Sequence, residues 1–178
     1  MADPDSTLIV DHIIGLARRL DIRTVLHLDA VAGFLGAALR HVLDYRHGRL
    51  APDDWRARIT GIVPSGTMLP FGYCYDAVLA EQLDDWLDAN EETFDLILAP
   101  RLALQSTREE ASRILQKLYR RAGALLLTVV PNNLKSTGVD AADNRLTLQL
   151  LSAAFPRVRF VDLGNLALAV IKNEFLPL

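Results

Sequence analysis

Two titratable side chains stand at the end of the first apolar segment, at residues 24–28. His27 lies within this segment and Asp29 directly follows it. Residues two apart in a strand share one face, so we expect both side chains to face one crevice. A histidine oriented by a carboxylate can act as a general acid or base. The alternative is structural, with a histidine bonded to backbone carbonyls and an aspartate that caps the next helix.

Four further polar residues follow other apolar segments and could line the same crevice. Arg101 and Gln105 come after the segment 94–99, and Asn132 comes after the most apolar one. Tyr73 lies in the loop after the second segment. With His27 and Asp29, Arg101 completes the candidate catalytic set, and the other three are candidate pocket-lining residues. Asparagines are also common turn formers, so an ordinary loop explains Asn132 equally well.

The sequence predicts no metal site. Asp84, Asp85 and Asp88 are spaced as expected for the solvated face of a helix. Cys74 is the only cysteine, which excludes an internal disulfide and a cysteine–histidine zinc finger. Nothing adjacent to Cys74 in the sequence would lower its pKa, so we expect a packed loop there.

Elements that could position these residues alternate along the chain. Short apolar runs bounded by glycine or proline predict strands, and apolar residues at helical spacing predict helices. Thr107 and Glu110 form a capping-box pair at the start of a long helix. The expected strands are 24–28, 58–63, 76–80, 94–99, 124–130, 158–163 and 167–171. The expected helices are one of about fourteen residues within 1–21, then 34–45, 81–89, 107–121 and 141–155, with 46–56 a loop or short extra helix.

The early strands are continuous apolar runs, which is typical of a parallel sheet covered on both faces. The last two are separated only by the Gly164-Asn165 region and must pair antiparallel. We therefore predict a Rossmann-like α/β three-layer sandwich. Its seven-stranded, mostly parallel sheet ends in a C-terminal antiparallel hairpin. The length of 178 residues fits a single domain over 1–178, with the N-terminal helix packed on it.

The composition of the chain argues against some classes of binding partner. The net charge is −3 and the 19 basic residues are scattered, which argues against nucleic-acid binding. No run of about 18 apolar residues is present, so we expect no membrane span. The polar, acidic N-terminus does not resemble a signal peptide, and together with the single cysteine this favours a cytoplasmic protein.

From about residue 8 to 171, the order of segments resembles the class I S-adenosylmethionine-dependent methyltransferases. The run TVLHLDAVAG at 24–33 occupies the place of the family motif V-L-D-x-G-x-G-x-G, with His27 where the family has an acidic residue. FDLIL at 94–98 resembles the fourth strand of the family, and VPN at 130–132 resembles the turn after the fifth. The resemblance implies a cofactor crevice across the carboxyl ends of the strands.

The cofactor motifs depart from the family at several positions. At the middle glycine place stands Val31, whose side chain would project where the ligand packs. At the place of the carboxylate that binds the ribose stands Val63, which accepts no hydrogen bond. The steric change at Val31 should cost about 1–3 kcal/mol and the lost ribose contact at Val63 about 1.5–3 kcal/mol. Together they should weaken binding roughly 100-fold to 10,000-fold. The residues at the family's cofactor-contacting places are Asp29, Val31, Gly33, Val63 and Gln82.

Three functions remain open, and with them the question of whether the chain is an enzyme. In the first, the chain is a methyltransferase-like binding subunit that uses no cofactor in the usual way and associates with a protein partner or with itself. In the second, it is an active methyltransferase that binds S-adenosylmethionine in an atypical pocket. In the third, the crevice binds a small molecule and performs lyase, cyclase or hydrolase chemistry with His27, Asp29 and Arg101.

Overall fold

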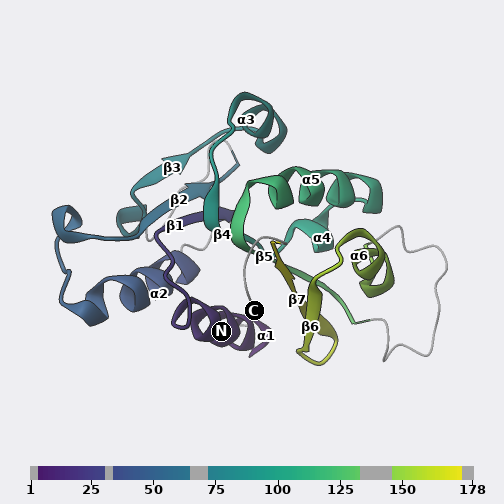
Figure 1. Ribbon diagram of the computed structural model, residues 1–178, viewed down its shortest axis with the longest axis horizontal. Helices are drawn as coiled ribbons and strands as arrows, with labels where there is room; N and C mark the ends of the chain where they lie inside the picture. The colour runs from purple at the N-terminus through teal and green to yellow at the C-terminus, as the bar shows by residue number, and fades with distance from the viewer. Residues whose placement is uncertain (1–3, 31–33, 65–71, 133–145, 174–178) are drawn as a thin grey trace.

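Seven apolar segments pair side by side into one sheet, in the order β3-β2-β1-β4-β5-β7-β6 (Figure 1). The computed structural model describes residues 4–30, 34–64, 72–132 and 146–173. The strands are β1 Thr24–Leu28, β2 Arg58–Ile62, β3 Ala77–Leu79, β4 Phe94–Ala99, β5 Ala122–Pro131, β6 Val158–Asp162 and β7 Leu166–Lys172. The helices are α1 Pro4–Ala17, α2 Phe34–Leu43, α3 Leu83–Ala89, α4 Leu102–Gln105, α5 Arg108–Arg121 and α6 Leu148–Ala154, with short 3-10 turns η1 Tyr45–His47, η2 Pro52–Asp54 and η3 Gly72–Cys74.

Strands β1 to β5 run parallel, and β7 is antiparallel to both β5 and β6. Gly164, in the turn between β6 and β7, has a φ of 88°, a left-handed conformation that glycine adopts without steric cost. Strand order reverses between β1 and β4, which are direct neighbours. In such sheets this switch point opens a crevice beyond the carboxyl ends of the strands. The predicted fold class is therefore confirmed.

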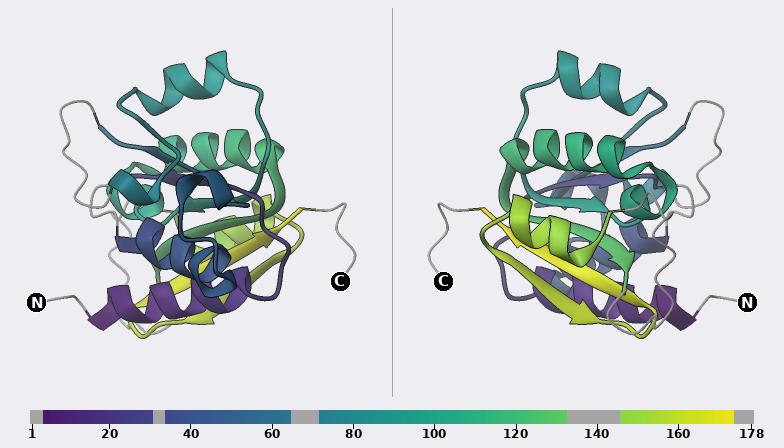
Figure 2. Two further views of the ribbon diagram at one scale, coloured as in Figure 1. Left: turned by 90° about the vertical axis from the view of Figure 1, so that its left-hand side faces the viewer. Right: turned by 90° about the vertical axis from the view of Figure 1, so that its right-hand side faces the viewer.

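Alternation of side chains divides the core into two layers. Leu26 of β1 packs in the cluster beneath α3, α5 and α6, where Leu115 and Phe155 are also buried. Val25 packs in the opposite cluster, together with Ile13 of α1 and residues of α2. Figure 2 shows helices on both sides of the strands in two edge-on views. This arrangement holds β1 in the middle of the molecule.

Several element bounds differ from the expected ones. α1 covers the 14 residues Pro4–Ala17, within the expected range 1–21. α6 begins only after Thr147, which caps it by accepting a hydrogen bond from the backbone N–H of Leu150, and residues 141–145 lie outside the described residues. α4 was not expected, because four residues are too few to show a helical period. The predicted Thr107 cap is confirmed, since its side chain accepts a hydrogen bond from the N–H of Glu110.

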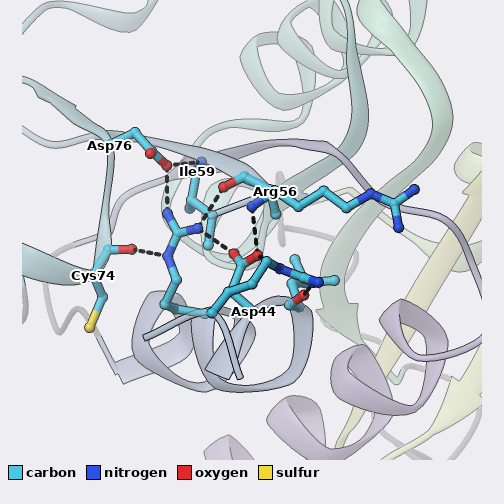
Figure 3. A network of polar contacts seen from close by, with 9 residues as sticks. Asp44, Arg56, Ile59, Cys74 and Asp76 are labelled. Atoms are coloured by element: carbon cyan, nitrogen blue, oxygen red, sulfur yellow. Dashed lines mark hydrogen bonds and ion pairs between the residues drawn. The ribbon is translucent and has the colours of Figure 1, made fainter. Parts of the chain in front are cut away.

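A buried arginine ties α2 to the amino-terminal ends of β2 and β3 (Figure 3). Arg40 is fully buried and donates to the Asp44 carboxylate at 2.6 Å and the Asp76 carboxylate at 2.5 Å. It also donates to the carbonyls of Cys74 and Ala57, at 3.1 and 2.5 Å. Its guanidinium carbon lies 3.7 Å from the centre of the Trp55 ring. We call Arg40, Asp44 and Asp76 the Arg40 cluster.

Asp44 is also fully buried, and it accepts hydrogen bonds from other residues besides Arg40. Its second carboxylate oxygen accepts from Nε of Arg49 and from the backbone N–H of Arg56, both at 2.8 Å. Burial alone would raise the pKa of Asp44, but these hydrogen bonds and those from Arg40 outweigh it and hold the pKa below its ordinary value. The charge of Arg40 is therefore matched within the fold.

No helix among the described residues is both long and apolar enough to cross a bilayer.

Candidate functional site

A pocket of about 210 Å³ lies at the carboxyl ends of β1, β2 and β4 and is closed by the chain after β3. We call it the crevice pocket. It lies where ligands of open α/β sheets bind, at the switch point between β1 and β4. Its volume is below the roughly 300–1,000 Å³ typical of pockets for small organic ligands. The polar residues that line it are Asp29, Glu81, Gln82, Gln105 and Ser106.

Asp29 stands at the first glycine place of the family motif and has the backbone conformation that glycine would adopt. Its φ is 53°, and aspartate is one of the few side chains that tolerate this left-handed region. Its Oδ2 atom is buried and accepts no hydrogen bond from the described residues. Nε of Arg101 lies 3.8 Å from that oxygen, which is a loose ion pair. Burial raises the pKa of Asp29, and the charge of Arg101 partly opposes this rise.

The predicted pair of His27 and Asp29 is not brought together in the crevice pocket. His27 is 4% exposed and is absent from the lining of the pocket. Its Nδ1 lies 2.8 Å from the Tyr75 hydroxyl in a hydrogen bond, and the two rings stack. Burial lowers the pKa of His27 to about 4, so the ring is neutral at pH 7. The two side chains do not share a face because Asp29 lies beyond the end of β1 and has a left-handed backbone, so the alternation of side chains along a strand no longer applies to it.

Tyr75 fits in this place because two glycines leave room for its ring. A Cβ atom on Gly36 would lie 2.2 Å from the ring carbon of Tyr75 that bears the hydroxyl. A Cβ atom on Gly61 would lie 3.0 Å from the same ring. Tyr75 therefore occupies space that an alanine at position 36 would remove. The sequence contained no signal for this contact, since the partners come from α2, β2 and the segment before β3.

The segment after β3 supplies a carboxylate that the sequence interpretation overlooked. Glu81 lines the crevice pocket beside Gln82, one of the predicted cofactor-contacting residues. Both side chains are exposed at the rim. Glu81 directly precedes Gln82 and follows a short strand, so its proximity in sequence was the available signal. It is an acceptor that could serve sugar hydroxyls in place of a carboxylate at the end of β2.

The other predicted residues occupy varied places. Gln105 and Val63 line the crevice pocket, and Val63 is 1% exposed. Tyr73 is 68% exposed and does not line this pocket. Asn132 is buried and donates to Asp162 Oδ1 at 3.1 Å and to the Gly164 carbonyl at 3.0 Å. Its amide oxygen has no partner among the described residues, and Asn132 does not line the pocket. Val31 and Gly33 lie outside the described residues.

The remaining chemical groups have structural surroundings. The Cys74 thiol is buried, which raises its pKa, and the residue's carbonyl accepts from Arg40. Asp84 of α3 forms a bidentate ion pair with Arg113 of α5, with both distances 2.6 Å. Asp88 pairs with Lys117 of α5. Over the part of the chain that the structure describes, no group of three or more candidate ligands could hold a metal ion.

Residues of the crevice pocket differ from those that the resemblance would place around S-adenosylmethionine. Val63 offers no acceptor to the ribose hydroxyls, and its side chain packs in the apolar core. Arg101 places a cation next to Asp29, where it competes with a positively charged sulfonium for the same carboxylate. The pocket is also small for a nucleoside with an amino-acid tail. Glu81 and Gln82 are the residues through which a nucleoside could still be held.

Comparisons with known proteins identify the fold. No family model matches the sequence, and no curated protein does. The chain superposes on magnesium protoporphyrin IX methyltransferase (ChlM) from Synechocystis PCC 6803 with bound SAH. That match has a TM-score of 0.66 at 12% identity and covers 96% of this chain and 84% of that one. It also superposes on the methyltransferase domain of bacterial CtHen1, with a TM-score of 0.61 at 12% identity, covering 92% and 96% of the two chains.

An O-methyltransferase family protein from Burkholderia thailandensis matches with a TM-score of 0.62 at 13% identity. That match covers 93% of this chain but only 56% of the other, so this chain spans little more than half of that relative. The seven-stranded sheet, parallel except for its antiparallel C-terminal pair, is consistent with these matches. The chain therefore has the fold of the class I S-adenosylmethionine-dependent methyltransferases.

Proposed function

We propose that this chain is a methyltransferase-fold binding protein that does not hold S-adenosylmethionine in the usual way and that acts through a protein partner or a second copy of itself. The observation that carries the proposal is Val63. It stands at the end of β2 with 1% of its surface exposed, where a sugar-binding carboxylate would be needed. Losing that charged contact costs about 1.5–3 kcal/mol, which weakens binding by tenfold to a few hundredfold.

A groove supports the partner half of the proposal. It has a volume of about 590 Å³ and lies between α1 and the sheet strands β5, β6 and β7. Apolar side chains of Leu16, Leu125, Val161 and Val170 line it, and we call it the α1 groove. Apolar surface that is not covered within the fold is typical of interaction sites. A measurement of molar mass by light scattering during size-exclusion chromatography tests self-association, and co-purification tests a partner.

Calorimetric titration with S-adenosylmethionine and with its demethylated product tests the cofactor half. We expect no binding in the micromolar range. A micromolar dissociation constant for either nucleoside would contradict the proposal. A Val63→Asp variant restores the missing acceptor and should strengthen nucleoside binding by about tenfold or more. Val63→Asn is the control, because asparagine is nearly the same size as aspartate but uncharged. Circular dichroism checks that both variants fold.

A second candidate function is active methyl transfer in an atypical pocket. One observation favours it: Glu81 and Gln82 both line the crevice pocket and could bind the sugar and the base. Under this alternative, the wild-type chain binds the nucleoside, and Glu81→Gln weakens binding by about tenfold. Glu91→Gln changes an exposed carboxylate that does not line the pocket and is the matched control. Equal effects of the two variants would exclude Glu81 as the sugar-binding group.

A further inference from the structure

A second cavity, of about 350 Å³, lies at the opposite end of β1 from the crevice pocket. It opens where the end of α1, the approach to β1 and the end of α2 meet. Ala17, Ile22, Val42 and Leu43 supply an apolar floor, and all four are buried. We call it the basic cavity, because its charged wall is mostly cationic. The charged and titratable residues of that wall are Arg18, Arg46, His47, Arg49, Arg56 and Asp21.

Two of these arginines are held in place by the fold. Arg49 donates from Nε to the buried carboxylate of Asp44 at 2.8 Å and from Nη2 to the Leu43 carbonyl at 2.5 Å. Arg56 is fixed through its backbone N–H, which donates to the same carboxylate of Asp44. Figure 3 shows the side chain of Arg56 extending away from this anchor. A buried anion thus positions the guanidinium group of Arg49 and the backbone of Arg56 at one cavity, which reduces the entropy that a ligand would have to overcome.

The cavity carries more positive charge than its neighbours neutralise. Arg56 pairs with Asp21 at 2.9 Å, and Asp21 is shared with Arg23. Arg18 and Arg46 form no ion pair with any described residue. Cations near the carboxyl end of α2 are favoured by its dipole, but that effect is confined to the last turn and does not require several cations at one hollow. This concentration also contrasts with the chain as a whole, whose net charge is −3.

We propose that the basic cavity binds a small organic molecule that carries a phosphate group. Guanidinium groups bind phosphate through paired, charge-assisted hydrogen bonds, and fixed arginines do so at least cost in entropy. The volume lies within the range of small-ligand pockets. The apolar floor predicts that an organic moiety adds affinity. A nucleic-acid backbone is a poorer fit, because the cations meet at one hollow rather than along a surface stripe.

Calorimetric titration of the whole chain at low ionic strength tests the proposal, with phenyl phosphate, inorganic phosphate and phenol as probes. We expect phenyl phosphate to bind more tightly than inorganic phosphate, and phenol not to bind. Arg18→Glu combined with Arg46→Glu should weaken phenyl phosphate binding by about a hundredfold, since each change removes a charged contact worth tenfold or more. Both arginines are exposed, so the double variant should fold.

Arg108→Glu combined with Arg120→Glu is the matched control. It changes the net charge equally at exposed positions of α5 that do not line the basic cavity. Phenyl phosphate binding should change less than about threefold in this control. The altered charges lie outside the cavity and act on the ligand only through weak long-range electrostatics. Equal weakening by the two double variants would show non-specific attraction and overturn the proposal. Absence of phenyl phosphate binding, or tighter binding of inorganic phosphate, would overturn it as well.

Discussion

The two ends of the parallel strands treat their charged groups in opposite ways. At the amino-terminal end, every charge of the Arg40 cluster is matched at hydrogen-bond distance within the fold. At the carboxyl end, Asp29 has a buried oxygen that accepts no hydrogen bond within the described part of the chain, and a loose ion pair of 3.8 Å. In the first arrangement each buried group has partners that replace its lost water contacts, so removal of one partner would destabilise the fold. The second arrangement leaves a carboxylate oxygen available to a ligand, as expected at the switch point where strand order reverses.

Breaking the Arg40 cluster should have the largest effect. Arg40→Met keeps the apolar stem of the side chain but leaves Asp44 buried with a weaker set of partners. We expect the free energy of unfolding to fall by about 3–5 kcal/mol, the cost of breaking a buried ion pair. Urea denaturation measures it. Arg113→Met, at an exposed ion pair, should cost less than about 1 kcal/mol. Equal losses in the two variants would contradict the distinction between the ends of the strands.

His27 should make stability depend on pH. Its pKa is about 4 in the fold against 6.5 as the ordinary value, so the unfolded chain binds more protons between these values. The contribution of the neutral His27 ring to the free energy of unfolding is fully present above pH 6.5. It falls by roughly 3 kcal/mol as the pH drops from 6.5 to about 4. Denaturation at several pH values checks this. His27→Gln should remove this part of the pH dependence, whereas His41→Gln, at an exposed position, should retain it.

Tyr75→Phe sharpens the comparison inside one face of the sheet. The change removes the hydroxyl that is bonded to Nδ1 of His27 and should cost about 1–2 kcal/mol of unfolding free energy, because a buried polar atom loses its partner. Thermal or urea denaturation measures it. Tyr73→Phe, at a mostly exposed side chain, should change the same quantity by less than about 0.5 kcal/mol. A loss in Tyr73→Phe as large as in Tyr75→Phe would contradict this account.

Asp29→Asn should have the smallest effect on stability. Asparagine tolerates the same left-handed backbone, and no residue that the structure describes donates a hydrogen bond to Oδ2 of the carboxylate. Because burial raises the pKa of Asp29, removing its charge should leave the free energy of unfolding unchanged or raise it by less than about 1 kcal/mol. Urea denaturation at pH 7 provides the value. A loss above about 2 kcal/mol would show that the crevice carboxylate is structural.

Local patterns predicted the elements of the sheet, and pairwise contacts between distant segments were beyond them. β4 and β5 were clear because continuous apolar runs end at prolines. The sequence placed Asp29 at the end of the first strand, and in the structure it lines the crevice pocket there. The side of the sheet that His27 faces could not be predicted, because it depends on Tyr75, which lies 48 residues away. Arg40 lies on a helix that looked amphipathic, and its burial depends on Asp76 and Ala57.

The glycine at position 36 has a consequence for how this chain can change. A methyl group there would collide with the Tyr75 ring, and Tyr75 in turn is bonded to His27. A larger residue at position 36 becomes acceptable only after the tyrosine has been exchanged for something shorter, and that exchange strands the imidazole. Changes at positions 27, 75 and 36 are therefore coupled, and a larger residue at position 36 requires compensating changes at the other two.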